Sequence, residues 1–228
     1  MFLSTGKINE RRLIMSNLDN TTKCTTSSRL LENVNYAARW IAKPALLTVL
    51  LALSTMAGAI YLPITPVPIT LQTLVLCIIG LTLTWREGIA SVVMYLALGA
   101  TGLPVFAGFK GGLAVLVGPT AGFLVGFIFG VAATAALKRI FDIALDAMMP
   151  ERSFKKTFVR FCTYSVASII GTIVIYAFGI FGQSYLTGMA LQTAASTLII
   201  FMIGDLIKAF AASAICSGLY NALNKKRA

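Results

Sequence analysis

Two ionisable residues near the end of the chain stand where charged side chains are rare. Asp205 and Lys208 are the only acid and the only base within the apolar run 189–223. Three residues apart on a helix, they share one face. An ionisable side chain at membrane depth is costly and by default marks a functional site facing the interior of a helix bundle. The pair is therefore a candidate solute contact, and the alternative is a mutually neutralising pair that holds helices together.

A third candidate stands in a glycine-rich segment. Lys110 lies in the sequence Phe106-Ala-Gly-Phe-Lys110-Gly-Gly112. It is either a solvated loop lysine or a cation at the mouth of an outward-facing pocket, where it would favour an anionic solute.

The residue types that several other chemistries need are missing from the sequence. It contains no His, which removes histidine acid–base chemistry and histidine metal ligands. No GxxxxGK[ST] phosphate loop occurs, so we do not expect the chain to hydrolyse ATP by itself. The four Cys are far apart and form no CxxC pair. We therefore expect neither an enzyme nor a metal site, and no cofactor.

The composition indicates that the solvent of this chain is a lipid bilayer. Of the 228 residues, 57% are hydrophobic and 12% are charged, and the mean hydropathy is +0.85. A soluble domain has about a quarter charged residues. The net charge of +11 does not indicate nucleic-acid binding, because the basic residues stand between apolar runs.

Six apolar runs predict an all-α membrane protein, a bundle of six transmembrane helices. The runs are 44–62, 69–85, 88–100, 119–137, 158–181 and 189–223. Arg86 and Glu87 are expected to form a tight turn, the glycine-rich segment 101–118 a loop that folds back over the helices, and residues 140–149 a separate short helix.

The chain is thereby divided into three parts. Residues 1–43 are expected to be a polar, largely disordered cytoplasmic tail, and residues 224–228 a basic cytoplasmic tail. The transmembrane domain is then 44–223. With both termini in the cytoplasm, 17 of the 19 Lys and Arg lie on the cytoplasmic side, as the positive-inside rule requires. Lys110 and Lys208 are the two that this rule does not explain.

Small residues recur every four positions along the fourth apolar run. They are Gly118, Gly122, Gly126 and Gly130. This spacing lets helix backbones approach closely, so we interpret it as helix packing. Phe123, next to one of these glycines, is a packing residue unless it faces the pocket and stacks on a ring.

Several motifs, in their order along the chain, resemble the BioY family of biotin-binding S components of energy-coupling factor transporters. They are Pro66-Val-Pro68-Ile-Thr70-Leu-Gln72-Thr-Leu, Gly102-Leu-Pro-Val-Phe106 with Gly111-Gly112, Gly118-Pro-Thr-Ala-Gly122-Phe and Gly204-Asp205-Leu-Ile-Lys208. The resemblance covers about residues 44–222. It implies a substrate-capture protein of the bacterial cell (inner) membrane that binds biotin from outside. It also implies a partner module made of a transmembrane T component and two ATPase subunits.

The resemblance also implies roles for the candidate residues. Asp205 can accept a hydrogen bond from a ureido N–H of biotin, and a bond of this charge-assisted kind is strong. Lys208 can hold Asp205 ionised or reach the ligand itself, and Lys110 can pair with the tail carboxylate or cover the pocket. The remaining candidate contacts are Gln72, Thr70, Phe123 and Tyr95.

A docking face is also implied on the first helix. S components often carry small residues four apart there, for contact with the T component. In this sequence the corresponding positions are Ala45 with Val49 and Thr48 with Ala52, a degenerate version of the pattern.

Two other hypotheses stay open at this stage. The same Asp205 and Lys208 pair would suit an S component or related transporter for another small, vitamin-like solute. The second hypothesis is an intramembrane enzyme or a structural membrane protein. The sequence offers no nucleophile with a base and no set of metal ligands that would support an enzyme.

Overall fold

The computed structural model describes residues 41–56, 59, 68–149 and 154–225, without the side chains of 197–200 and 223–225. The chain divides into two units, Met1–Ala42 and Lys43–Ala228. The first unit lies almost wholly outside the described residues, as do most of the predicted tails 1–43 and 224–228. The architecture below is that of the second unit.

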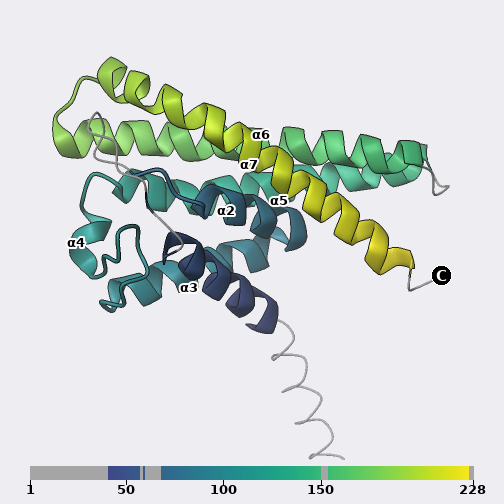
Figure 1. The fold of residues 1–228 in the computed structure, drawn as a ribbon, viewed down its shortest axis with the longest axis horizontal. Coiled ribbons are helices and arrows are strands. Elements are labelled where there is room, and N and C mark those ends of the chain that lie inside the picture. Colours follow the sequence, from purple (N-terminus) through teal and green to yellow (C-terminus); the bar gives the residue numbers. More distant parts are fainter. Residues whose placement is uncertain (1–40, 57–58, 60–67, 150–153, 226–228) are drawn as a thin grey trace, which may run out of the picture. The chain divides into compact units, whose positions relative to one another are not determined.

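The described residues are helical, with no β-strand longer than an isolated bridge, which confirms the all-α prediction (Figure 1). After a helix at Ile41–Met56, the elements are α2 (Gln72–Thr82), α3 (Trp85–Ala100), α4 (Leu113–Leu116), α5 (Ala121–Met148), α6 (Phe154–Thr187) and α7 (Leu191–Lys225).

Within the part of the chain that the structure describes, three helical segments are long and apolar enough to cross a membrane. They are Ala121–Met148, Phe154–Thr187 and Phe201–Ala222. The helices Ile41–Met56 and Gln72–Thr82 are apolar but shorter. Together with the composition, these helices make the chain a multi-pass membrane protein.

The boundary between α2 and α3 differs from the prediction. The hydroxyl of Thr84 accepts the backbone N–H of Glu87 at 3.4 Å, and the Glu87 carboxylate accepts the backbone N–H of Thr84 at 3.0 Å. This reciprocal pair is a capping box, which starts a helix at the next residue. Arg86 and Glu87 therefore belong to the first turn of α3, and the prediction of a tight turn there is wrong.

The predicted separate helix at 140–149 is also wrong, because α5 runs without a break from Ala121 to Met148. Charged residues in the second half of α5 suggested a connector there. They are compatible with a helix, since Lys138 pairs with Asp142 one turn later at 3.3 Å.

Close backbone contact joins α5 to α6. The glycines of α5 that face α6 are Gly122, Gly126 and Gly130. A Cβ atom on Gly126 would lie 2.9 Å from the carbonyl oxygen of Ile175, and one on Gly122 would lie 2.7 Å from the Cα of Gly182. Only glycine allows this approach. Gly118 precedes the first residue of α5 and contacts its own turn, so its predicted place in the helical stripe is wrong.

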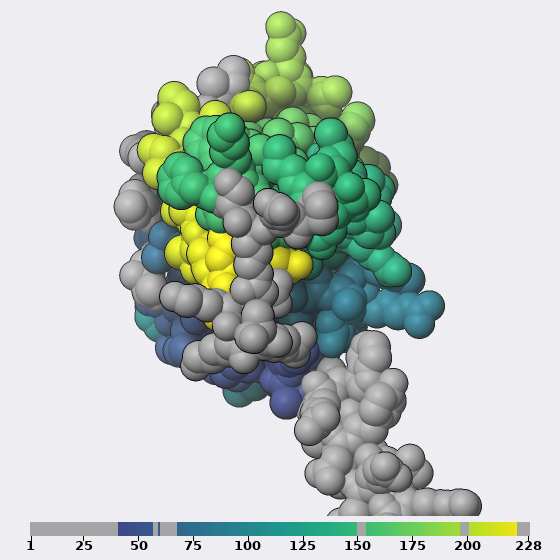
Figure 2. Space-filling view, turned by 90° about the vertical axis from the view of Figure 1, so that its right-hand side faces the viewer, coloured from purple at the N-terminus to yellow at the C-terminus, as the bar shows by residue number. Residues whose placement is uncertain are grey.

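An ionic cluster joins α5, α6 and α7 at one end of the unit. Arg160 of α6 is buried, with its Nε 3.3 Å from Asp142 and its Nη2 3.2 Å from Asp146, both on α5. Its guanidinium carbon lies 3.8 Å from the ring centroid of Tyr220 on α7. Figure 2 looks onto this end, where the yellow part of α7 lies beside the green parts of α5 and α6.

The helix Ile41–Met56 packs on α3 through hydroxyl groups. The Thr48 hydroxyl lies 2.8 Å from the carbonyl oxygen of Ser91 and 3.2 Å from the Ser91 hydroxyl. Thr48 is buried as a result, so its predicted place on an exposed docking face is wrong. Val49 is exposed, whereas Ala45 and Ala52 are partly buried.

The segment after α3 is a loop, as predicted, apart from the single turn of α4. An antiparallel bridge joins Phe106 to Lys110, and the N–H of Gly112 donates to the carbonyl of Gly99 at 2.7 Å. The buried ring of Phe106 occupies the space where a side chain at Gly99 would otherwise lie. It also contacts Tyr95 edge to face, with the ring centroids 5.5 Å apart. These contacts fix the loop against α3.

Candidate ligand-binding site

A cavity of about 440 Å³ lies between α2, α5, α6, α7 and the loop after α3. Sites for small molecules have volumes of about 300–1,000 Å³ and are mostly apolar with a few placed polar groups. Aromatic side chains of the lining are Phe106, Phe123, Phe127 and Phe201. Polar side chains of the lining are Thr70, Gln72, Thr73, Lys110, Thr120, Tyr176, Asp205 and Lys208.

The carboxylate of Asp205 is the buried acid of this cavity. Its Oδ1 accepts the Thr73 hydroxyl at 2.7 Å and the Lys208 ammonium at 2.8 Å. Its Oδ2 accepts the Tyr176 hydroxyl at 2.6 Å. A carboxylate out of water is stable only when it is paired and hydrogen-bonded, and these three donors meet that need.

Lys208 connects α7 to the start of α2. Its Nζ donates to the carbonyl oxygen of Thr70 at 2.6 Å and lies 3.3 Å from the hydroxyl of Thr73, besides its contact with Asp205. An ammonium group has three N–H donors, so each has an acceptor within the protein.

A relay of hydrogen bonds connects the cavity to the loop after α3. The Gln72 amide nitrogen donates to the Tyr95 hydroxyl at 2.8 Å, and that hydroxyl donates to the carbonyl oxygen of Val105 at 3.0 Å. Thr55 donates to the same carbonyl at 2.6 Å. Tyr95 is fully buried behind Gln72 and does not line the cavity, so it supports the wall rather than forming it.

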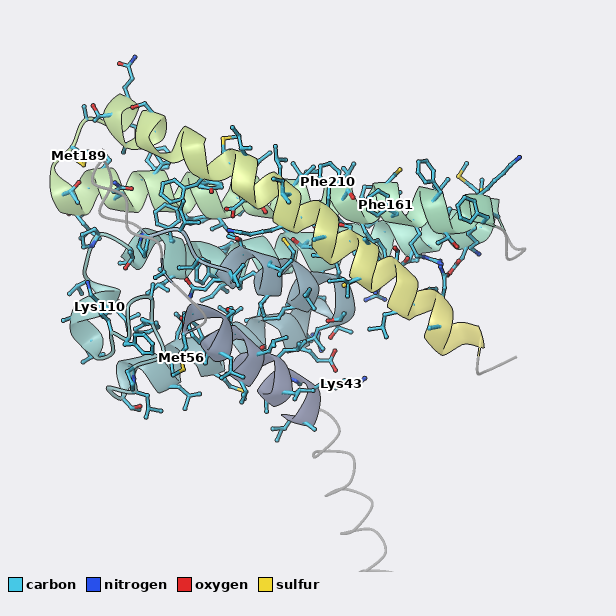
Figure 3. The ribbon with its side chains drawn as sticks, viewed as in Figure 1. Lys43, Met56, Lys110, Phe161, Met189 and Phe210 are labelled. Carbon is cyan, nitrogen blue, oxygen red and sulfur yellow. The ribbon has the colours of Figure 1, made fainter. Side chains whose placement is uncertain are left out.

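Lys110 lines the cavity from the loop and is itself exposed. Figure 3 shows Lys110 and Met189, which lies in the turn between α6 and α7, at the left of the view, and Lys43 to the right of both, below the middle of the unit. Residues just before α5, including Gly118 and Thr120, also line the cavity. The cavity therefore has a cation near an exposed rim and an acid in its buried interior.

Phe123 lines the cavity from the first turn of α5. Its ring lies over Gly179 of α6, where a side chain would collide with it. It also contacts Tyr176 edge to face, with the centroids 6.2 Å apart. Phe123 therefore both packs two helices and orients a polar residue of the lining.

The structure brings six of the seven candidate contacts to this one cavity. They are Asp205, Lys208, Lys110, Gln72, Thr70 and Phe123. Tyr95 lies behind the wall. Sequence reasoning missed Thr73 and Tyr176, both of which bond to Asp205. Thr73 follows Gln72 in the first of the four motifs, and this position beside a candidate contact indicates a role in the site. Tyr176 is one polar tip in a long apolar run, which carries no such signal.

Comparison with known proteins agrees with the motifs. Residues 23–225 match the model of the BioY family. "Biotin transporter BioY" of Rhizobium etli is 39% identical over 65% of this chain and 75% of its own length. "Biotin transporter BioY" of Thermotoga maritima is 36% identical over 72% of this chain and 87% of its own length.

"Probable biotin transporter BioY" of Bacillus subtilis is 33% identical over 79% of this chain and 89% of its own length. The fold is similar to a crystal structure at 2.1 Å of the S-component for biotin from an ECF-type ABC transporter. The TM-score is 0.70 and the identity 24%, over 82% of this chain and 93% of that one. The resemblance seen in the motifs is thus confirmed, and the chain belongs to the BioY family.

Proposed function

We propose that this protein is the membrane-embedded substrate-capture component of a biotin uptake system. The observation that carries the proposal is the cavity itself, which combines a buried carboxylate, an apolar middle and a lysine near its rim. Biotin has the complementary groups: ureido N–H donors, an apolar ring and tail, and a terminal carboxylate. The names of the relatives, several of them biotin transporters, support the same solute.

In the proposed complex, Asp205 accepts a ureido N–H and the aromatic wall covers the ring system. Lys110 pairs with the tail carboxylate near the rim. Gln72 has one amide N–H beyond the one it gives to Tyr95, so it can donate to the ligand. Lys208 holds the Asp205 carboxylate in place and does not contact the ligand, because its donors already have acceptors within the protein.

We further propose six membrane spans in residues 44–223, with both termini on the cytoplasmic side of a bacterial cell membrane. The distribution of basic residues supports this orientation. It puts the rim with Lys110 outside, where a solute enters, and the Arg160 cluster inside. Lys110 and Lys43 lie well apart along the long axis of the unit, which agrees with this orientation (Figure 3).

The energy source is proposed to be a separate module, with a transmembrane T component and two ATPase subunits. The sequence has no phosphate-binding loop of its own. The exposed side of the helix Ile41–Met56 offers Val49 for docking, with Ala45 and Ala52 at its edges. Co-purification of the chain with a co-expressed module would test this assembly.

The direct test is binding of labelled biotin to the purified chain reconstituted in lipid. We expect saturable binding with a dissociation constant below about 1 µM. Other vitamins added in excess should not displace the label. If there is no saturable binding, or if another vitamin competes better than unlabelled biotin, the proposed solute is wrong.

A further inference from the structure

The two carboxylate oxygens of Asp205 have different surroundings. Oδ1 accepts two hydrogen bonds, from Thr73 and Lys208. Among the described residues, Oδ2 accepts one, from the hydroxyl of Tyr176. A carboxylate oxygen has about two acceptor positions. Oδ1 is therefore filled, and Oδ2 is the atom that can accept a further N–H.

Tyr176 is the hydroxyl that stands beside this remaining acceptor position. It reaches the cavity from α6, and its oxygen lies 2.6 Å from Oδ2. The edge-to-face contact with Phe123 holds its ring, whereas the hydroxyl hydrogen is free to rotate about the C–O bond. The cavity thus presents a donor and an acceptor side by side.

A cyclic urea has the matching pair on one edge. Its N–H and its carbonyl oxygen are two bonds apart and point in similar directions. An edge of this kind forms two parallel hydrogen bonds with an adjacent acceptor and donor. Two hydroxyls of the described residues bond to Asp205, and only Tyr176 can do this, because Thr73 stands on the filled oxygen.

On the basis of the proposed function, we infer that Tyr176 is a specificity-determining residue that recognises the ureido carbonyl. When the ligand enters, the Tyr176 hydroxyl turns from Oδ2 to donate to the carbonyl oxygen, and Oδ2 accepts the neighbouring N–H. One hydrogen bond inside the protein is replaced by two to the ligand. A different ligand ring can have the N–H but no oxygen acceptor beside it. The Tyr176 hydroxyl then keeps its bond to Oδ2, and the ligand forms one hydrogen bond fewer and binds more weakly.

The test compares biotin with thiobiotin, in which sulfur, a weak acceptor, replaces the ureido oxygen. In the unaltered chain we expect thiobiotin to bind about tenfold more weakly. In Tyr176→Phe we expect biotin binding to weaken about tenfold and the two ligands to bind within about threefold of each other. Isothermal titration gives both constants, and size-exclusion chromatography checks folding.

Two variants separate recognition from structural support. Tyr185→Phe makes the same change on α6 at a residue that is 88% exposed, and should leave both constants unchanged. Thr73→Val removes a donor to Oδ1 and should weaken both ligands together, so that the biotin preference stays.

The inference is overturned if Tyr176→Phe keeps the full preference for biotin over thiobiotin. The same holds if Thr73→Val abolishes this preference as completely as Tyr176→Phe does. It is also overturned if the unaltered chain binds both ligands equally, a result that needs no variant. If the unaltered chain binds no biotin, the proposed function itself fails. Biotin binding with an unchanged preference in Tyr176→Phe refutes the role of Tyr176 alone.

Discussion

At the scale of single residues, the cavity depends on one buried charge and the donors that surround it. Asp205 takes hydrogen bonds from three different helices or their edges, namely from Thr73 at α2, Tyr176 on α6 and Lys208 on α7. Three donors hold the carboxylate in one orientation before a ligand arrives. Such preorganisation lowers the cost of binding, because little freedom remains to be lost.

Replacing this carboxylate by an amide should weaken ligand binding while the helices stay in place. For Asp205→Asn we expect the dissociation constant for biotin to rise by more than about tenfold, because a charge-assisted acceptor becomes a neutral one. Binding of labelled biotin to the reconstituted variant measures this. Asp146→Asn is the matched control, since Asp146 is half exposed and lies in the Arg160 cluster. Equal affinity in Asp205→Asn would reduce Asp205 to a structural role.

The residues that sequence analysis found and missed differ in how they stand out from their surroundings. Asp205 and Lys208 are charges in an apolar run, and the cost of burying a charge makes them informative without a structure. Tyr176 stands in an equally apolar run, but a tyrosine there is ordinary, and its role depends on the helix that faces it. Thr48 has the small size expected of a docking face, yet its hydroxyl bonds to Ser91 in the interior.

At the scale of helices, the α5–α6 contact depends on the absence of side chains. A Cβ atom on Gly130 would lie 2.8 Å from the carbonyl oxygen of Gly171 and would also meet the side chain of Ile175. We expect Gly130→Ala to lower the stability of the protein by about 1–3 kcal/mol, because the two helices must move apart. Thermal unfolding in detergent, followed by helix circular dichroism, measures the change.

Gly218 on α7 provides the control for this prediction. A Cβ atom there meets nothing within 4 Å. Gly218→Ala should therefore be neutral or stabilising by up to about 1 kcal/mol, as expected from helix propensity alone. Similar midpoints for Gly130→Ala and Gly218→Ala would show that close approach of α5 and α6 contributes little.

Helix boundaries were harder to predict than helix identity. The all-α class followed from composition and from the length of the apolar runs. The extension of α5 through Lys138 and Asp142 did not, because charges after an apolar run suggest a connector until their partners are known. The start of α3 is set by the reciprocal bonds of Thr84 and Glu87, three residues apart, a short signal that a tight-turn interpretation overlooked.

At the scale of the whole molecule, the proposed orientation can be tested by labelling single cysteines. In a chain without its native Cys, Phe109→Cys lies in the loop after α3 and Met148→Cys at the end of α5. The native residues are 61% and 79% exposed, so both sites are open to a reagent. We expect a membrane-impermeant maleimide to label Phe109→Cys in intact cells, and Met148→Cys only after permeabilisation. The reverse pattern would contradict cytoplasmic termini.

The Arg160 cluster has a consequence for how a bound solute could be released. This cluster fastens α5, α6 and α7 at one end, and the glycine contacts hold α5 against α6 farther along. We therefore expect these three helices to move as one rigid body. The other side of the cavity is formed by the loop after α3, which Tyr95 and Thr55 bind at the carbonyl of Val105. The ring of Phe106 fixes this loop against α3. Any movement of this loop should therefore break the bonds to Val105 and withdraw the ring of Phe106 from α3, while α5, α6 and α7 keep their arrangement.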